Sequence, residues 1–490
     1  MDNSEDVFLE KKIIRMPIAI NRSFSDYDTA NIQSARQANI IRNLFSPLIE
    51  NDANANIIPG VAARFEWINN DSELVFYIRD NLKTITGYQI TAEDAYLSLK
   101  RLIIKNTNTH GSLKSFLCPD SNVSKISDVC PGLSYNDNKL ILKPTSKEVR
   151  KFILPLLTSL DFSVIPKISI NWNNLNYSIV DYTNTSGPYY VYHEDPNGNS
   201  TLKANENHYH YKTTIPQEVH LVVKGYSSSV DMLKQNKIDL IPTYDGSSLG
   251  ERLSLESDPK FNVHRTIEID LKALSFTSVG KKKFSPSERH CIGLKVKKSF
   301  LNHFRTKEAA TPTNEYFPVF GEGSLDEDKK VELAEYIKQF ESCEFKKNIT
   351  ISEVQTSIDA YRDDFKNDPN INFIEFTKLP WLKEESEQED AYMLFADTGF
   401  YESVSLLSHY LPKITNMTTD ESAKWIEDYI AIENKEDRFK LLRKLHFDIL
   451  KQGYIIPFSV SPIVAVARAP WKPNFYKFYA GTPLWMLEAN

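Results

Sequence analysis

Apolar and polar positions alternate along the first half of the chain and follow helical spacing in much of the second half. Period-two alternation or compact apolar runs predict strands at 12–20, 72–79, 199–205, 217–224, 348–354, 371–376, 454–460 and 462–467. Apolar residues at helical spacing predict helices at 29–44, 91–102, 228–236, 285–304, 326–340 and 433–452. The long helices lie beyond Asp270, so the sequence predicts mixed α/β domains built from discontinuous segments.

The stretch ITAEDAYLSLKRL, residues 90–102, carries strong signals for the start of a helix. Thr91 is the predicted N-cap, and Asp94 stands three positions on, as in a capping box. Ala95, Leu99 and Leu102 form one apolar stripe, which is typical of a helix that packs on a sheet. These signals explain why the helix forms but not which function it serves.

Length and charge limit the classes of protein. A chain of 490 residues predicts two or three domains. The net charge is 58 − 65 = −7 without long basic blocks, so we expect no nucleic-acid partner. No apolar run is long enough to span a membrane, and the acidic start of the chain is unlike a signal peptide. We therefore expect either a cytoplasmic protein or an exported one whose leader was removed.

The cysteines leave two readings open. Cys118 and Cys130 flank a polar loop and either form a disulfide or remain two thiols, whereas Cys291 and Cys343 lie far apart in the sequence. No CxxC pair, HExxH motif or phosphate-binding glycine loop is present. We expect no cofactor, no metal and no catalytic residue.

Two short patterns suggest chemistry with little specificity. Gly246–Gly250 has the GxSxG form of a hydrolase nucleophile elbow around Ser248, although the preceding residues favour a polar loop. His208 and His210 alternate as metal ligands on a strand do, but the polar segment 205–212 favours a solvated surface loop. A serine hydrolase is therefore the less favoured alternative.

Asp397 is a stronger candidate for ligand contact. It ends the apolar run 392–396 just before a glycine-containing turn, where side chains at the end of a strand face ligands in many proteins. The alternative is that Asp397 caps a following helix near Glu402. Trp381 is either a cleft aromatic or an ordinary core residue.

Several segments, taken in order, resemble the family 5 extracellular solute-binding proteins, the peptide and nickel receptors of ABC importers. The resemblance covers nearly the whole chain. Its residues are Asn43–Ile49, Asp52, Ile58–Ala62, Trp67, Phe76–Arg79, Thr91–Ala95 with Ser98 and Arg101, Ser186–Tyr189, Asn205, Tyr209, Ile238–Asp239, Ile456–Phe458, Arg468 and Trp471.

This resemblance implies an α/β, two-lobed periplasmic-binding-protein fold of class II, with an extra subdomain and a hinge between the lobes. Lobe I would comprise residues 1–48, 162–266 and 461–490, the extra subdomain 49–161, and lobe II 267–460. The helix at 91–102 would be part of the framework of the extra subdomain.

The resemblance also implies which residues contact a ligand. In the peptide receptors an aspartate holds the ammonium group of the ligand, and Ala396 and Asp397 match the motif that carries it. The implied ligand-binding residues are Asp397, Phe395, Ala396, Trp381, Asp26, Tyr27, Ser159, Ser186 and Tyr189. For the last five of these a purely structural role is an equal alternative.

The implied function is a non-enzymatic receptor that captures a peptide or other small solute and presents it to the membrane permease of an ABC importer. Such a receptor is periplasmic or extracellular, associated with the membrane through its transporter, and expected to be monomeric. The alternative within the same fold is a signal-sensing binding protein that is not coupled to transport.

Overall fold

The computed structural model shows a chain that divides into two compact units. Unit 1 comprises Met1–Thr266 and Val464–Asn490, and unit 2 comprises Ile267–Ile463. The chain passes between them within strands β12 (Phe261–Phe276) and β17 (Ile455–Arg468). The structure describes residues 12–18, 27–32, 34–105, 111–145, 149–174, 176–195, 198–225, 227–304, 309–318, 321–353, 363–375, 383–397, 411 and 414–489.

Unit 1 contains a four-stranded sheet in the order β1-β10-β9-β8. β1 runs parallel to β10, and the other neighbours are antiparallel. Buried and half-buried residues alternate along β9, as the sequence predicts for a strand with one covered face. These strands are β1 (Ile13–Ile18), β8 (Tyr189–Glu194), β9 (Ser200–Ala204) and β10 (Glu218–Val223).

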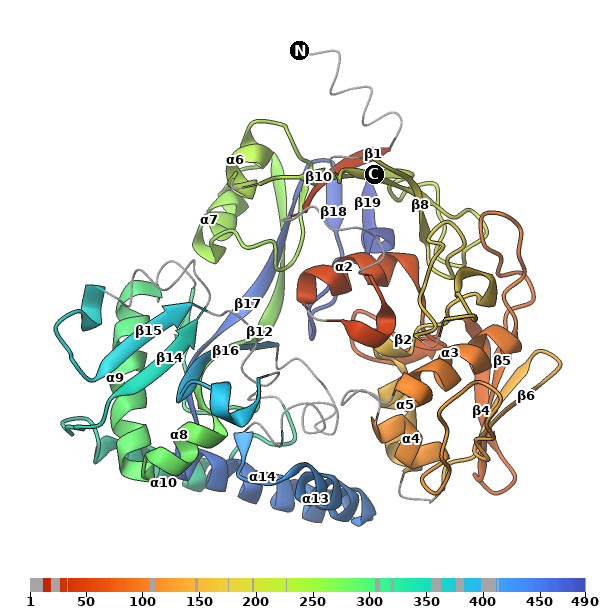
Figure 1. Cartoon of the computed structure of the whole chain (residues 1–490). Coiled ribbons are helices and arrows are strands. Elements are labelled where there is room, and N and C mark those ends of the chain that lie inside the picture. The colour runs from red at the N-terminus through yellow and green to blue at the C-terminus, as the bar shows by residue number, and fades with distance from the viewer. Residues whose placement is uncertain are drawn as a thin grey trace. The chain divides into compact units, whose positions relative to one another are not determined.

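A second sheet of unit 1 has the antiparallel order β4-β5-β7-β6; Figure 1 labels its strands β4, β5 and β6. Helix α3 (Ala92–Lys105) packs against β6 and β7. Cys118 and Cys130 form a disulfide here, with their Cα atoms 5.2 Å apart. The elements of this part are β4 (Ala62–Ile68), β5 (Glu73–Ile78), α4 (Gly111–Leu117), β6 (Leu133–Asn136), β7 (Lys139–Leu142) and α5 (Arg150–Leu157).

Helix α3 is held by its polar side chains as well as by its apolar stripe. Asp94 is fully buried and accepts hydrogen bonds from the backbone N–H of Thr91 at 2.8 Å, the hydroxyl of Tyr88 at 2.9 Å and the backbone N–H of Lys167 at 2.7 Å. Ser98 Oγ accepts from the backbone N–H of Ile165 at 2.8 Å. Three segments are thus tied to one helix, which therefore acts as the framework of this part of unit 1.

The remaining elements of unit 1 are short. Strand β11 pairs antiparallel with β17 through the pairs Leu240 with Ala467 and Ile241 with Val466. The shorter elements are α2 (Ala35–Leu44), β2 (Ile49–Asn51), β3 (Ile57–Pro59), α6 (Ser229–Lys234), β11 (Leu240–Ile241), α7 (Leu249–Leu253), β18 (Trp471–Pro473), β19 (Leu487–Ala489) and the 3-10 turns Thr29–Asn31, Leu160–Phe162, Lys167–Ser169, Ser254–Ser257 and Leu484–Met486.

Unit 2 is built on strands in the order β17-β12-β16-β14-β15, with β13 on β17. β14 is parallel to both of its neighbours, while β12 and β16 are antiparallel. The elements are α8 (Ser278–Lys283), α9 (Pro286–Phe304), β13 (Thr311–Pro312), α10 (Glu327–Lys338), β14 (Ile349–Glu353), β15 (Ile371–Glu375), the 3-10 turn Glu385–Glu387, β16 (Ala391–Asp397), α13 (Thr419–Ala431) and α14 (Lys435–Lys451).

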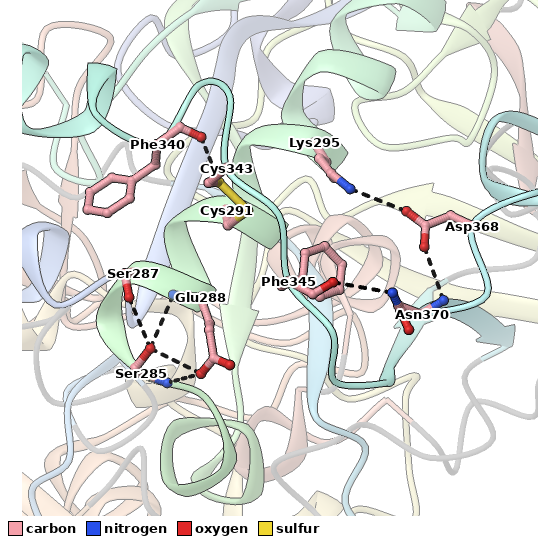
Figure 2. Close-up of a disulfide and its surroundings, with 10 residues drawn as sticks. All are labelled: Ser285, Ser287, Glu288, Cys291, Lys295, Phe340, Cys343, Phe345, Asp368 and Asn370. Atoms are coloured by element: carbon pink, nitrogen blue, oxygen red, sulfur yellow. Dashed lines mark hydrogen bonds and ion pairs between the residues drawn. A yellow bond between two sulfur atoms is a disulfide. The ribbon is translucent and has the colours of Figure 1, made fainter.

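Helix α9 packs its buried face on this sheet. It is fixed at its start and in its second turn by the contacts that Figure 2 shows. At its start, Glu288 accepts from the backbone N–H of Ser285 at 2.8 Å, and the hydroxyl of Ser285 accepts from the N–H of Glu288 at 3.3 Å, which is a capping box. Cys291 forms a disulfide with Cys343, with their Cα atoms 5.7 Å apart. No local sequence signal pairs these two cysteines.

Three other sequence predictions need correction. The helix predicted at 29–44 is a 3-10 turn followed by α2, because Ser34 accepts from Gln37 N–H and caps a new helix. Strand β12 was missed, because the change from strand-like to helical spacing was placed at Asp270, which lies inside this strand. The two strands predicted around 454–467 are one strand, β17, because the backbone angle of proline is compatible with extended structure. The boundaries of lobe I, lobe II and the extra subdomain stay predictions.

Candidate functional site

Asp397 is the last residue of strand β16. β16 pairs antiparallel with β12, and Asp397 lies directly opposite Asp270. Directly opposite residues of antiparallel strands project from the same face, with their Cβ atoms about 4.5–5.5 Å apart. The structure therefore brings two carboxylates together at this end of the sheet.

Lys272 and Phe395 form the next cross-strand pair on the same face. The ammonium group of Lys272 bonds to the carboxylate of Asp270, and it also lies 4.9 Å from the centre of the Phe395 ring. The side chains of Lys272 and Asp270 are only 13% and 16% exposed, whereas Phe395 is 38% exposed. A largely buried ion pair thus stands beside an accessible aromatic ring.

Hydrophobic packing holds both strands in place around this group. The next two cross-strand pairs on the same face belong to the core of unit 2. They are Leu274 with Met393 and Phe276 with Ala391. On the opposite face Ala396 is buried and pairs with Leu271. Because a slip of one residue would move the apolar core side chains of one strand to the other face, the register is strongly specified. The four side chains Asp397, Asp270, Lys272 and Phe395 are called the carboxylate site below.

The carboxylate site contains charges of both signs. Asp270 and Asp397 lie directly opposite each other, and like charges in this arrangement destabilise a strand pair. Lys272 offsets this repulsion at Asp270.

Two of the candidates predicted in unit 1 are inside its core. Ser186 is fully buried; its hydroxyl donates to the carbonyl of Val164 and accepts from the N–H of Ser46 at 3.1 Å. Tyr189 is also fully buried; its hydroxyl donates to the carbonyl of Pro216 at 2.9 Å, and burial raises its pKa well above the ordinary value. Both side chains hold backbone segments of unit 1 together.

Tyr27 belongs to the same hydrophobic core and is 6% exposed, with its carbonyl accepting a hydrogen bond from the hydroxyl of Tyr182 at 3.2 Å. Ser159 is half-buried and donates to Asp161 at 2.7 Å at the start of a 3-10 turn. Asp26 and Trp381 lie outside the described residues.

The neighbours of Ser159 line a small pocket in unit 1. Arg42 lies in its wall, 5.4 Å and 5.7 Å from the ring centres of Tyr476 and Tyr479. Glu50 also lines it and is hydrogen-bonded to the hydroxyl of Tyr209 and to Nε2 of His210, the latter at 2.7 Å. With its carboxylate already bonded, Glu50 serves the packing of unit 1.

The histidine segment was predicted to be a solvated loop, and this is wrong for His208. His208 is 3% exposed, its Nε2 lies 3.2 Å from Ser46 Oγ, and burial lowers its pKa well below the ordinary value. His210 stacks on Trp485, with ring centres 5.0 Å apart. Among the described residues, no group of three or more His, Cys, Asp or Glu side chains is placed to hold a metal ion.

Ser248 occupies the N-cap position of the five-residue helix α7. Strand β11 ends at Ile241, and the intervening loop contains Asp245, which accepts from both the N–H and the hydroxyl of Ser247. A nucleophile elbow instead places its serine on a sharp turn directly between strand and helix. In the part of the chain that the structure describes, no helix has the length and apolar character needed to cross a membrane.

Comparison with known proteins decides the family. The family described as bacterial extracellular solute-binding proteins, family 5, matches residues 56–340, which is more than half of the chain. The chain belongs to this family. The resemblance inferred from the sequence is thereby confirmed.

Family 5 relatives include the periplasmic oligopeptide-binding protein OppA of Salmonella typhimurium, which is 25% identical over 224 residues. The match spans 44% of this chain and only 40% of that relative. Haemophilus influenzae OppA, solved with the peptide RPPGFSPFR, is similar with a TM-score of 0.71 at 14% identity, covering 98% of this chain and 99% of that one. DppA from Helicobacter pylori, solved with the peptide STSA, gives a TM-score of 0.73 at 13% identity, and the match covers 98% of this chain and 99% of that one. These likenesses show the fold, a mixed α/β solute-binding-protein fold.

In this family 5 chain, the sequence predicted Asp397, Phe395 and Ala396 as candidates but did not point to Asp270 and Lys272, which the structure places on the neighbouring strand. A signal was present in residues 267–273, IEIDLKA, where apolar and polar positions alternate with the period of a strand. That alternation places Asp270 and Lys272 on one face. Their position opposite β16 could not be predicted, because pairing between strands far apart in sequence depends on the whole fold.

Proposed function

We propose that this chain is a non-enzymatic receptor that binds a peptide-like solute and delivers it to the permease of an ABC importer. The observation that carries the proposal is the carboxylate site, where two carboxylates lie opposite each other at the end of β16 beside an accessible aromatic ring. The membership of family 5 and the peptides named with two of its structural neighbours support the choice of ligand.

The carboxylate site suits the ammonium group at the start of a peptide. Asp397 is half-buried, so a bond between its carboxylate and an ammonium group would be charge-assisted and only partly exposed to water. Phe395 provides an accessible apolar surface two residues away on the same face. A free ammonium group with an adjacent apolar side chain is therefore the ligand that fits best.

We also propose a periplasmic or extracellular location and a monomeric receptor. The two disulfides, Cys118–Cys130 and Cys291–Cys343, support export because disulfides persist in oxidising compartments and are rare in the cytosol. Curated relatives named as periplasmic support the same location. Closure of the lobes through a hinge and delivery to a permease stay predictions.

The test begins with native mass spectrometry of the purified protein and identification of any molecule released on denaturation. Titration calorimetry with Ala-Ala-Ala then compares the parent chain with Asp397→Ala. Loss of the charge-assisted bond should weaken binding by about 100-fold, equivalent to about 2.7 kcal/mol.

Asp328→Ala is a matched control, because it removes an exposed carboxylate on helix α10 of the same unit and should leave the affinity unchanged. Equal affinities of Asp397→Ala and the parent chain would reject the assignment of Asp397. Release of a defined small molecule other than a peptide, together with no binding of Ala-Ala-Ala, would reject a peptide receptor.

A further inference from the structure

We propose that a pocket of unit 1 around Arg42 binds a carboxylate group. The carboxylate comes either from the end of a peptide or from a free small carboxylate such as acetate. The pocket lies wholly within unit 1, whereas the carboxylate site described above belongs to unit 2, so the two sites can be tested separately. The pocket is called the Arg42 pocket below, and its wall includes Arg42, Phe45, Glu50, Tyr476, Tyr479 and Trp485.

The guanidinium group of Arg42 is held in place by its surroundings. Arg42 lies in the last turn of helix α2, where the helix dipole favours a positive charge. Its guanidinium lies 5.4 Å and 5.7 Å from the ring centres of Tyr476 and Tyr479, which stack with their centres 4.1 Å apart. Gly481 leaves room beside it, because a Cβ atom there would lie 2.9 Å from Nε of Arg42. The cation is therefore positioned before a ligand binds, which lowers the cost of binding.

The positive charge of Arg42 has no negative partner in the part of the chain that the structure describes. Its partners there are the two tyrosine rings and the hydroxyl group of Tyr476. Burial raises the pKa of Tyr476 and of Tyr479, so both hydroxyl groups stay neutral. Nε of Arg42 is buried and has no hydrogen-bond acceptor among the described groups. Because a guanidinium group matches a carboxylate in both geometry and charge, a carboxylate is the ligand group that fits best.

The carboxylates close to the Arg42 pocket are engaged elsewhere. Glu50 is bonded to a tyrosine hydroxyl and to Nε2 of His210, the latter at 2.7 Å, and Arg79 lies 4.4 Å from the centre of that same tyrosine ring. Asp161, beside the pocket wall, accepts from a neighbouring serine hydroxyl at 2.7 Å. Neither carboxylate forms an ion pair with Arg42. The negative charge of Glu50 weakens the attraction for an anion, but it leaves the donors of Arg42 available to a ligand.

The rest of the wall limits what accompanies the carboxylate. Phe45 is fully buried, and Leu160 and Trp485 are each 8% exposed. These side chains surround the charged part with apolar surface, so a short apolar group next to the carboxylate is favoured over a second charge. The methyl groups of acetate and of a C-terminal alanine meet this requirement.

The first arm of the experiment compares Ala-Ala-Ala with its C-terminal amide by titration calorimetry. If the carboxylate belongs to a peptide, the parent chain should bind the free acid at least about tenfold more tightly, because the amide loses a charge-assisted bond. Arg42→Met should abolish this preference. Arg36→Met is the matched control, because it removes an exposed arginine of the same helix, and it should keep the preference.

The second arm detects binding of free acetate by saturation-transfer NMR. If the pocket takes a free carboxylate, the acetate signal should appear with the parent chain and Arg36→Met and disappear with Arg42→Met, while acid and amide bind equally. Circular dichroism checks that each variant is folded. If Arg42→Met does not fold, Gly481→Ala replaces it: the added methyl group displaces the guanidinium and should weaken the binding seen in either arm at least about threefold.

The two arms also separate this inference from the proposed function. If folded Arg42→Met keeps both the acetate signal and the acid-to-amide ratio of the parent chain, the role of Arg42 is overturned and the receptor function stands. Equal affinities for acid and amide, together with no acetate signal from the parent chain, overturn it as well. An acetate signal that depends on Arg42, together with no binding of Ala-Ala-Ala, would support the Arg42 pocket and reject the peptide receptor.

Discussion

Two buried cations of unit 1 and two of unit 2 are held in different ways. In unit 1, Arg101 is fully buried against Asp28, and Lys224 lies 3.2 Å from Asp245 with the side chains 10% and 1% exposed. In unit 2, the ammonium of Lys281, which is 8% exposed, donates to the carbonyl of Thr415, and Arg289 donates to the carbonyl of Gln452 at 2.8 Å. These cations of unit 1 face full negative charges, whereas those of unit 2 face dipoles.

This difference has a consequence for stability. A carbonyl dipole offsets the loss of hydration of a cation less completely than a carboxylate does, so burial disfavours the charged form more strongly in unit 2. Burial, together with the nearby Arg289, lowers the pKa of Lys281 to about 7. In unit 1 burial would raise the pKa of Asp28, but the charge of Arg101 and its hydrogen bond lower it overall. The buried charges of unit 1 should therefore stabilise it, and Lys281 should destabilise unit 2.

The largest expected effect comes from breaking a pair in unit 1. Arg101→Met leaves Asp28 without its principal partner, and removal of one member of a buried ion pair costs about 3–5 kcal/mol of unfolding free energy. It also removes the hydrogen bond from Arg101 to the carbonyl of Tyr177 at 2.6 Å. Urea unfolding of the parent chain and the variant at pH 7 measures the difference.

Two features separate this effect from a loss of packing. Lys105→Met is the matched control, because Lys105 lies 3.5 Å from the same carboxylate with its side chain 22% exposed, so its loss should cost about 1 kcal/mol. Because the pKa of Asp28 is lowered, the pairing contributes stability above pH 3.8 and loses it as the pH falls further. A penalty for Arg101→Met that stays constant down to pH 2 would contradict the pairing.

The two disulfides allow a second comparison between the units. Cys291 and Cys343 are 52 positions apart, and Cys118 and Cys130 are 12 apart. Loop-closure entropy predicts a stabilisation of about 4 kcal/mol for the longer loop and about 3 kcal/mol for the shorter one. Replacing each pair by alanines should therefore destabilise unit 2 more than unit 1 in calorimetric unfolding. The reverse order would show that strain or residual structure outweighs loop length.

The elements of the fold could be predicted best where local signals agree. Helix α3 begins one residue after the predicted N-cap Thr91, and α9 begins one residue after Ser285. β12 was missed although residues 267–273 alternate with the period of a strand, because the change to helical spacing was placed at Asp270, inside this strand. The Cys291–Cys343 bridge was missed because 52 residues separate cysteines that the fold brings together.

The candidate site was predictable only on one strand. Asp397 and Phe395 stand in an apolar run that ends in a turn, which is a local signal, whereas the importance of Asp270 and Lys272 comes from their register with β16. Ser186 and Tyr189 show the opposite error: polar residues at a turn suggested ligand contact, but the structure uses them to satisfy buried backbone groups. Polar side chains near turns serve both purposes, and burial separates the two.

The smallest effect provides the sharpest test of the difference between the units. Lys281→Met replaces a buried cation by an apolar side chain of similar length and should stabilise unit 2 by about 2 kcal/mol at pH 6. The folded pKa of about 7 lies below the unfolded value of 10.5, so between these values the unfolded chain binds more protons and stability of the parent rises with pH. The advantage of Lys281→Met should therefore shrink as the pH rises from 7 toward 10, in urea unfolding at pH 6, 8 and 9.5.

Lys282→Met, at a neighbouring side chain that is 71% exposed, should change stability by less than about 0.5 kcal/mol at any pH. Destabilisation by Lys281→Met at pH 6 would show that the bond to Thr415 outweighs the cost of burying the charge, and the contrast between the units would then fail.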